Sequence, residues 1–168
     1  EKEIVRLLLN YGNKTLKFEK ETISIAAFII AELKADKMTF ENEQYQMMLD
    51  EISEILQKEG KIKLDYFTLH FNPAISRLTI DLISNEYNMS ENWNKRHKIL
   101  TGTEENKIRK AVESSLYSLK LKHLDARLGD IQFQLKENPE NVEGITKTYA
   151  KYLQVRKQIA EKLGRTMC

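Results

Sequence analysis

The histidines and glycines that could bind a metal or a nucleotide are scattered along the chain. His70, His97 and His123 share no short ligand spacing and have no cysteine beside them, so they do not form a zinc motif. Gly60-Lys61 lacks both the upstream glycine and the following Ser or Thr of a phosphate-binding loop. We therefore expect no metal, cofactor or nucleotide site in this chain.

Acidic residues are abundant, but no pair of them is typical of a catalytic centre. Asp50, Glu51 and Glu54 fall on the polar face of a predicted helix, where solvation accounts for them. Trp93 and His97 could form a binding patch, since Trp is enriched at interfaces, or Trp93 could instead anchor a small core. No pair of acidic residues is therefore expected to be catalytic.

Three residues near the C-terminus are candidates for partner binding. Tyr149 and Tyr152 lie in the apolar stripe of the last predicted helix, where they either pack on a neighbouring helix or remain available to a partner. Arg156 stands where the same spacing predicts an apolar residue, so its side chain either reaches solvent or pairs with a carboxylate. The sequence leaves both pairs of alternatives open.

The elements that must position these residues are predicted to be helices. The chain has 168 residues, 41% of them hydrophobic and 31% charged, with Gly 6 and Pro 2. Antiparallel β folds need a turn about every 8–12 residues, so the scarcity of breakers predicts an all-α protein. A single cysteine, Cys168, excludes a disulfide framework, and no apolar run approaches the roughly 18 residues that cross a bilayer. We expect a cytoplasmic chain without a membrane segment.

Helix caps and apolar spacing predict a helical bundle over residues 1–102. Gly12 and Gly60 are stop signals. Asn42 and Asn72-Pro73 are start signals, and Thr22 is the predicted cap of the second helix. The predicted helices cover about residues 2–10, 23–33, 43–59, 64–71 and 73–83.

Residues 103–168 are predicted to form a long helix and a C-terminal antiparallel helical hairpin. From 103 to 137 only Gly129 interrupts the helical pattern, and Asn138-Pro139 then repeats the cap-plus-proline signal before a last helix that Gly164 ends. Two apolar seams joined by a tight turn are typical of such a hairpin. The seam of the long helix consists of Leu121, Leu124, Leu128, Ile131 and Leu135, which alternate three and four apart as in a heptad.

The two predicted parts differ in charge. Residues 1–103 hold 14 Lys and Arg against 16 Asp and Glu, whereas residues 104–168 hold 13 against 9. The final helix is basic, so a partner surface should be acidic, unless these cations only form a solvated face. Direct nucleic-acid binding should be weak or absent, because the pI of ≈ 8.5 and the alternating charges are not typical of such proteins.

Four segments of the sequence resemble a known family. They read EKEIVRLLLNYGNK, FIIAELKADKMTFENEQYQ, NPAISRLTIDLISNEYNMSENW and QIAEKLGR. Together they resemble the C-terminal domain of bacterial DNA primases of the DnaG type, particularly those of the Bacteroides group, over essentially the whole chain. None of the four segments is a catalytic motif, so the resemblance rests on patterned segments in the right order.

The resemblance implies a helicase-binding domain. In that family a helical bundle precedes a long helix and a hairpin, which docks on the N-terminal domains of the replicative DnaB-type helicase. The zinc-binding and polymerising domains, which use zinc and magnesium, precede this segment. The chain is therefore expected to recruit primase for RNA primer synthesis and to modulate helicase activity, without catalysis of its own.

The docking residues are expected on the terminal helix, where apolar anchors among basic residues would steer and orient the encounter. They are Tyr152, Leu153, Arg156, Lys157, Ala160, Leu163 and Arg165. In isolation the chain is expected to be a monomer. The alternative function is a self-associating structural or regulatory module, in which the hairpin seams of two copies pair to form a dimer.

Overall fold

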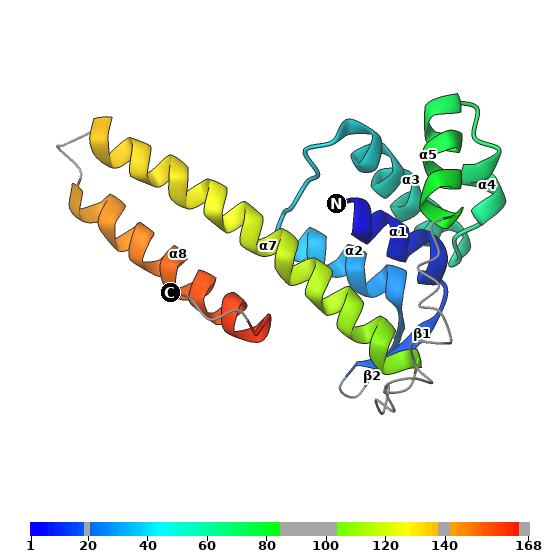
Figure 1. The fold of residues 1–168 in the computed structure, drawn as a ribbon, viewed down its shortest axis with the longest axis horizontal. Coiled ribbons are helices and arrows are strands. Elements are labelled where there is room, and N and C mark those ends of the chain that lie inside the picture. The colour runs from blue at the N-terminus through cyan, green and yellow to red at the C-terminus, as the bar shows by residue number, and fades with distance from the viewer. Residues whose placement is uncertain (19–20, 85–103, 138–141, 165–168) are drawn as a thin grey trace, which may run out of the picture. The chain divides into compact units, whose positions relative to one another are not determined.

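The computed structural model describes residues 1–18, 21–84, 104–137 and 142–164, and these are predominantly helical (Figure 1). The prediction of an all-α fold is confirmed, with the addition of one small two-stranded sheet. The chain divides into two units, Glu1–Val112 and Glu113–Cys168, and the division falls inside helix α7 (Glu104–Glu137). The predicted boundary near residue 102, together with Trp93, His97 and the Asn138-Pro139 turn, lies outside the described residues.

The first unit is built around helix α1 (Lys2–Tyr11), which is buried on most of its sides. Its apolar residues are too crowded for a thin stripe, so the helix packs against several neighbours at once. These neighbours are α2 (Ile25–Ala35), α3 (Glu43–Glu59) and α5 (Pro73–Ser84). The residues that form this central core element are Ile4, Val5, Leu7, Leu8 and Leu9. The backbone N–H of Gly12 donates to the Leu8 carbonyl at 2.9 Å, and the predicted stop at Gly12 is confirmed.

A short β-hairpin follows α1, and the sequence interpretation missed it. Strand β1 (Thr15–Phe18) pairs antiparallel with β2 (Glu21–Ser24). The prediction that Thr22 caps the second helix is wrong, because Thr22 lies in β2 opposite Lys17. Helix α2 (Ile25–Ala35) is capped instead by Ser24, whose hydroxyl accepts from the Ala27 N–H at 3.2 Å.

The predicted caps are found at the helices that follow, although α4 (Leu64–Thr68) ends three residues before the predicted end at Phe71. The Asn42 side chain accepts from the Tyr45 N–H at 3.1 Å at the start of α3 (Glu43–Glu59), and Gly60 ends the helix with φ 72°. After α4 (Leu64–Thr68), the Asn72 side chain accepts from the Ala74 N–H at 3.0 Å and opens α5 (Pro73–Ser84). The predicted signals at Asn42, Gly60 and Asn72-Pro73 are therefore confirmed.

The second unit consists of the later part of α7 and helix α8 (Val142–Lys162). Helix α7 is continuous through Gly129. Of the five predicted seam residues, Leu121, Leu128 and Ile131 are buried and the other two are half-buried. Helix α8 ends two residues before Gly164, which has φ 66°. None of the described helices is both long enough and apolar enough to cross a membrane.

Candidate interaction surface on the helical hairpin

Two polar contacts join α7 to α8 and fix the register of the hairpin. The Arg156 Nε donates to Asp125 Oδ1 at 2.5 Å, and the Gln132 Nε2 donates to the Tyr149 hydroxyl at 2.6 Å. Asp125 and Gln132 are seven residues apart on α7, and their partners Arg156 and Tyr149 are seven residues apart on α8. Because the partners follow in reverse order, the two helices run antiparallel in a single register. Of the alternatives left open by the sequence, Arg156 pairs with a carboxylate and Tyr149 contacts α7.

The same register explains the apolar positions between these contacts. It places Leu121 opposite Ala160 and Leu128 opposite Leu153. Leu121, Leu128 and Ala160 are 9%, 6% and 2% exposed, whereas Leu153 is 38% exposed. Buried apolar positions thus alternate with polar contacts along the hairpin, and Leu153 is the more exposed of these apolar residues.

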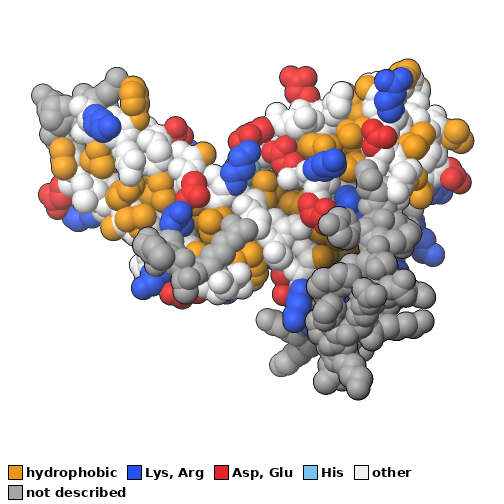
Figure 2. All heavy atoms as spheres, in the orientation of Figure 1, with side chains coloured by type: hydrophobic (Ala, Val, Ile, Leu, Met, Phe, Trp, Pro, Cys, Tyr) orange, Lys and Arg blue, Asp and Glu red, His pale blue; other side chains and the backbone are white. Residues whose placement is uncertain are grey.

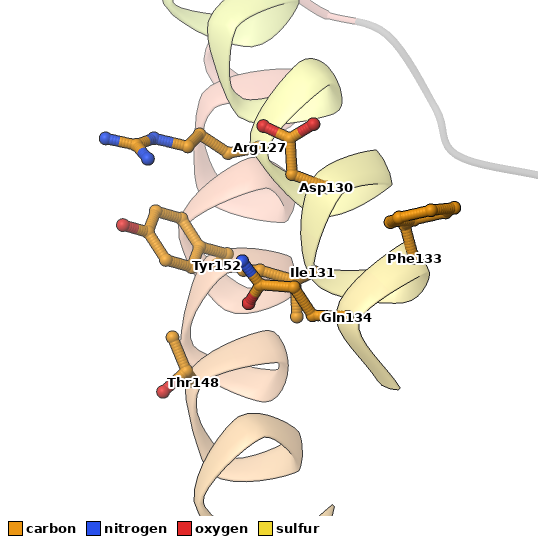
Figure 3. Close-up of a pocket in the computed structure, with 7 residues that line it drawn as sticks. All are labelled: Arg127, Asp130, Ile131, Phe133, Gln134, Thr148 and Tyr152. Carbon is orange, nitrogen blue, oxygen red and sulfur yellow. The ribbon is translucent and has the colours of Figure 1, made fainter. Parts of the chain in front are cut away.

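A groove of about 420 Å³ runs along one side of the hairpin (Figure 3). The close-up shows Tyr152 of α8 on the same side as Arg127 of α7, while Phe133 points away from both. The residues that line the groove are Arg127, Asp130, Ile131, Phe133, Gln134, Thr148 and Tyr152. Tyr152 is half-buried here, so its ring is partly packed on the hairpin and partly available to another molecule.

Exposed apolar side chains on the hairpin lie near cations. Phe133 is 61% exposed and Val155 is 43% exposed, in addition to Leu153. Figure 2 shows hydrophobic side chains along this part of the molecule with Lys and Arg side chains beside them. Lys151 and Lys157 of α8 are both exposed. Exposed apolar side chains beside charged residues are a composition common among protein-binding surfaces.

The structure describes six of the seven predicted docking residues, and these form three groups. Leu153 and Lys157 are exposed, and Tyr152 and Leu163 are half-buried. Arg156 and Ala160 face α7, the first half-buried and bonded to Asp125 and the second 2% exposed. Arg165 lies outside the described residues.

A second exposed apolar cluster, in the first unit, was not found by sequence reasoning. Leu69 and Phe71, between α4 and α5, are 83% and 86% exposed. His70 between them is buried, and its Nε2 lies 3.1 Å from Glu51 Oε2 on α3. Its Nδ1 accepts from the Asn72 N–H at 3.1 Å, whereas neither Nε2 nor Glu51 Oε2 makes a hydrogen bond among the described residues. The sequence signal that could have predicted this cluster is the run Leu69-His70-Phe71, in which two apolar residues flank a histidine.

Tyr66 of α4 completes this cluster. Its ring meets those of Phe67 and His70 edge to face, with centroids 5.1 and 5.6 Å away. Tyr66 is 45% exposed, and its partial burial raises the pKa of the phenol above its usual value. The nearby Glu51 carboxylate raises this pKa further. Among the described residues, no group of three or more His, Cys, Asp or Glu side chains is placed to hold a metal ion.

The described chain is thus a helical protein whose second unit is a helical hairpin with polar contacts between its two helices. Over residues 1–166 it matches the model of the family described as a domain of unknown function, DUF8430, and it belongs to that family. The match includes both units and the whole of α8. None of the curated proteins and none of the solved structures matches the chain.

Proposed function

We propose that this chain is the helicase-binding domain of a bacterial DNA primase and that it docks on the N-terminal domains of the replicative DnaB-type helicase. The resemblance of its four segments to that family supports the proposal, as does the combination of a helical first unit with a helical hairpin. The observation that carries it is the surface of α8, where Leu153 and Val155 are exposed beside Lys151 and Lys157.

In the proposed mechanism, apolar side chains anchor the partner and a basic side chain steers the encounter. Leu153 and the half-buried Tyr152 ring are the apolar anchors, because burying them against a partner removes their remaining surface from water. Lys157 attracts an acidic partner surface and orients the encounter. Arg156 and Ala160 act indirectly, since they hold α8 on α7.

On this proposal the protein acts in the cytoplasm and contributes no catalysis. It holds primase at the replication fork, where the polymerising part of the parent protein makes RNA primers, and it modulates the helicase. Zinc and magnesium belong to other domains of that parent protein.

The test is the affinity of the chain for the N-terminal domain of the replicative helicase from the same organism, measured by isothermal titration calorimetry. We expect Leu153→Asp and Lys157→Glu each to weaken binding at least tenfold. Leu69→Asp and Lys61→Glu make the same changes at exposed positions of the first unit and serve as matched controls. A wild-type chain that does not bind the helicase would overturn the proposal.

A further inference from the structure

Helix α3 carries an exposed stripe of acidic residues around one apolar side chain. Glu43, Met47, Asp50 and Glu54 follow one another at steps of four, three and four residues, so they share one face of the helix. Met47 is 43% exposed, and a groove of about 390 Å³ opens beside it above the buried Phe40. We call these four α3 residues the acidic stripe.

Helix α8 carries a stripe of the opposite charge. Lys147, Lys151 and Val155 follow at steps of four residues on the face that points away from the contacts with α7. Val155 is 43% exposed. Lys147 pairs with Glu143 at 2.7 Å, but both side chains are more than two-thirds exposed, so this pair is easily exchanged for another. We call these three α8 residues the basic stripe.

The two stripes match each other in spacing as well as in charge. In the acidic stripe Met47 lies between charged residues, whereas in the basic stripe two lysines precede Val155 at intervals of about one turn. When two helices carrying the stripes pack antiparallel with the apolar residues facing, the two lysines face Asp50 and Glu54, and Glu43 has no charged opposite. The resulting pairs are Val155 with Met47, Lys151 with Asp50, and Lys147 with Glu54.

We propose that a second copy of this chain occupies the acidic stripe, with the basic stripe of its α8 lying antiparallel along α3. Charge complementarity selects this occupant, because both members of each pair are exposed on the chain itself. The contact joins different surfaces of two copies, so it produces either a closed dimer with two such contacts or a longer open assembly. This association goes beyond the proposed function and does not depend on it, since no helicase takes part.

The two copies are joined chiefly by exposed charges around one small apolar contact, so the association should be weak and sensitive to salt. Screening shortens the range of exposed charge pairs to about 3 Å at 1 M salt. We expect the mass of the intact chain to rise with concentration in low salt and to return to that of a monomer in 1 M sodium chloride. Multi-angle light scattering measures both.

Charge reversal tests the pairing itself. Asp50→Lys with Glu54→Lys reverses the acidic stripe, and Lys147→Glu with Lys151→Glu reverses the basic stripe. Each double variant should weaken self-association at least tenfold, whereas the fourfold variant, in which both stripes are reversed, should restore it. Lys110→Glu with Lys136→Glu is the control, because it makes the same charge change at exposed positions of α7.

Three outcomes would overturn the proposal. The first is a wild-type chain that stays monomeric at every concentration in low salt. The second is self-association that neither double variant weakens, which would point to another surface such as the exposed Leu69 and Phe71. The third is a fourfold variant that fails to regain association although its circular dichroism and melting temperature match those of the wild type.

Discussion

The Arg156 guanidinium on α8 is bonded to the Asp125 carboxylate on α7, with Nε 2.5 Å from Oδ1. Arg156 occupies a position at which the heptad spacing predicts an apolar residue. The two side chains are 28% and 46% exposed, so the pair lies at the edge of the helix interface. Ion pairs in such positions contribute about 0–1 kcal/mol, and the pair serves chiefly to select the register of the hairpin.

A double-mutant cycle measures this contribution. We expect Arg156→Ala and Asp125→Ala each to lower the free energy of unfolding by about 0.5–1 kcal/mol. The double variant should lose about as much as either single variant, because the second change removes a partner that is already absent. Urea unfolding followed by circular dichroism gives these values.

The neighbouring exposed cation is the control for this cycle. Lys157→Ala should change the free energy of unfolding by less than about 0.5 kcal/mol. Full additivity of the Arg156 and Asp125 changes would show that the two side chains do not interact in solution.

The parts of the fold that sequence reasoning found are those determined by neighbouring residues. Asn42, Gly60 and Asn72-Pro73 act on backbone groups within three residues or one helical turn, so their types and spacing were sufficient. The helices between them are long enough to show a clear apolar period. Helix positions were therefore predictable to within one or two residues for most of the described chain.

The parts that it missed depend on contacts between distant segments. Strands β1 and β2 have four residues each, too few for alternation to be distinguished from a helix start. The pairing of His70 with Glu51 depends on how α4 packs against α3. Similarly, the spacing placed Arg156 in the seam, but only the register of α7 against α8 identifies Asp125 as its partner.

Two phenylalanines four residues apart should differ sharply in their effect on stability. Phe67 is fully buried, whereas Phe71 is 86% exposed. We expect Phe67→Ala to lower the free energy of unfolding by about 3–5 kcal/mol, through lost burial and the cavity left behind. Phe71→Ala should change it by less than about 0.5 kcal/mol. Urea unfolding of the two variants checks both values, and equal losses would contradict the burial described for this corner.

Tyr66 provides a prediction about pH. Burial raises the pKa of its phenol, with the Glu51 carboxylate as a further cause, so the folded chain should keep this phenol protonated above pH 10. As pH rises, Tyr66 then loses its proton in the unfolded chain before it does so in the folded chain. The contribution of Tyr66 to stability is therefore present below pH 10 and is lost as pH rises through the folded pKa. The absorbance of the wild-type chain at 295 nm minus that of Tyr66→Phe measures the ionisation of this phenol.

Removing the Glu51 charge should lower the pKa of Tyr66 without restoring its usual value, because the larger cause is burial. Glu51→Gln tests this in the same absorbance titration. Glu59→Gln removes another carboxylate of α3 and should leave the Tyr66 titration unchanged. A Tyr66 phenol that titrates at its usual pKa in the wild-type chain would contradict the packing described for α4.

Two glycines should respond in opposite directions to replacement by alanine. Gly129 lies inside the continuous helix α7, and an added Cβ would meet nothing within 4 Å. Gly129→Ala should therefore raise the free energy of unfolding by about 0.8–1 kcal/mol, because alanine loses less backbone entropy in a helix. At Gly12 an added Cβ would clash with the Leu8 carbonyl oxygen and would lie 2.6 Å from Ile62 Cδ1. Gly12→Ala should thus lower it by about 1–3 kcal/mol through overpacking. Thermal unfolding in parallel distinguishes the two, and a loss of stability in Gly129→Ala would show that α7 bends at this residue in solution.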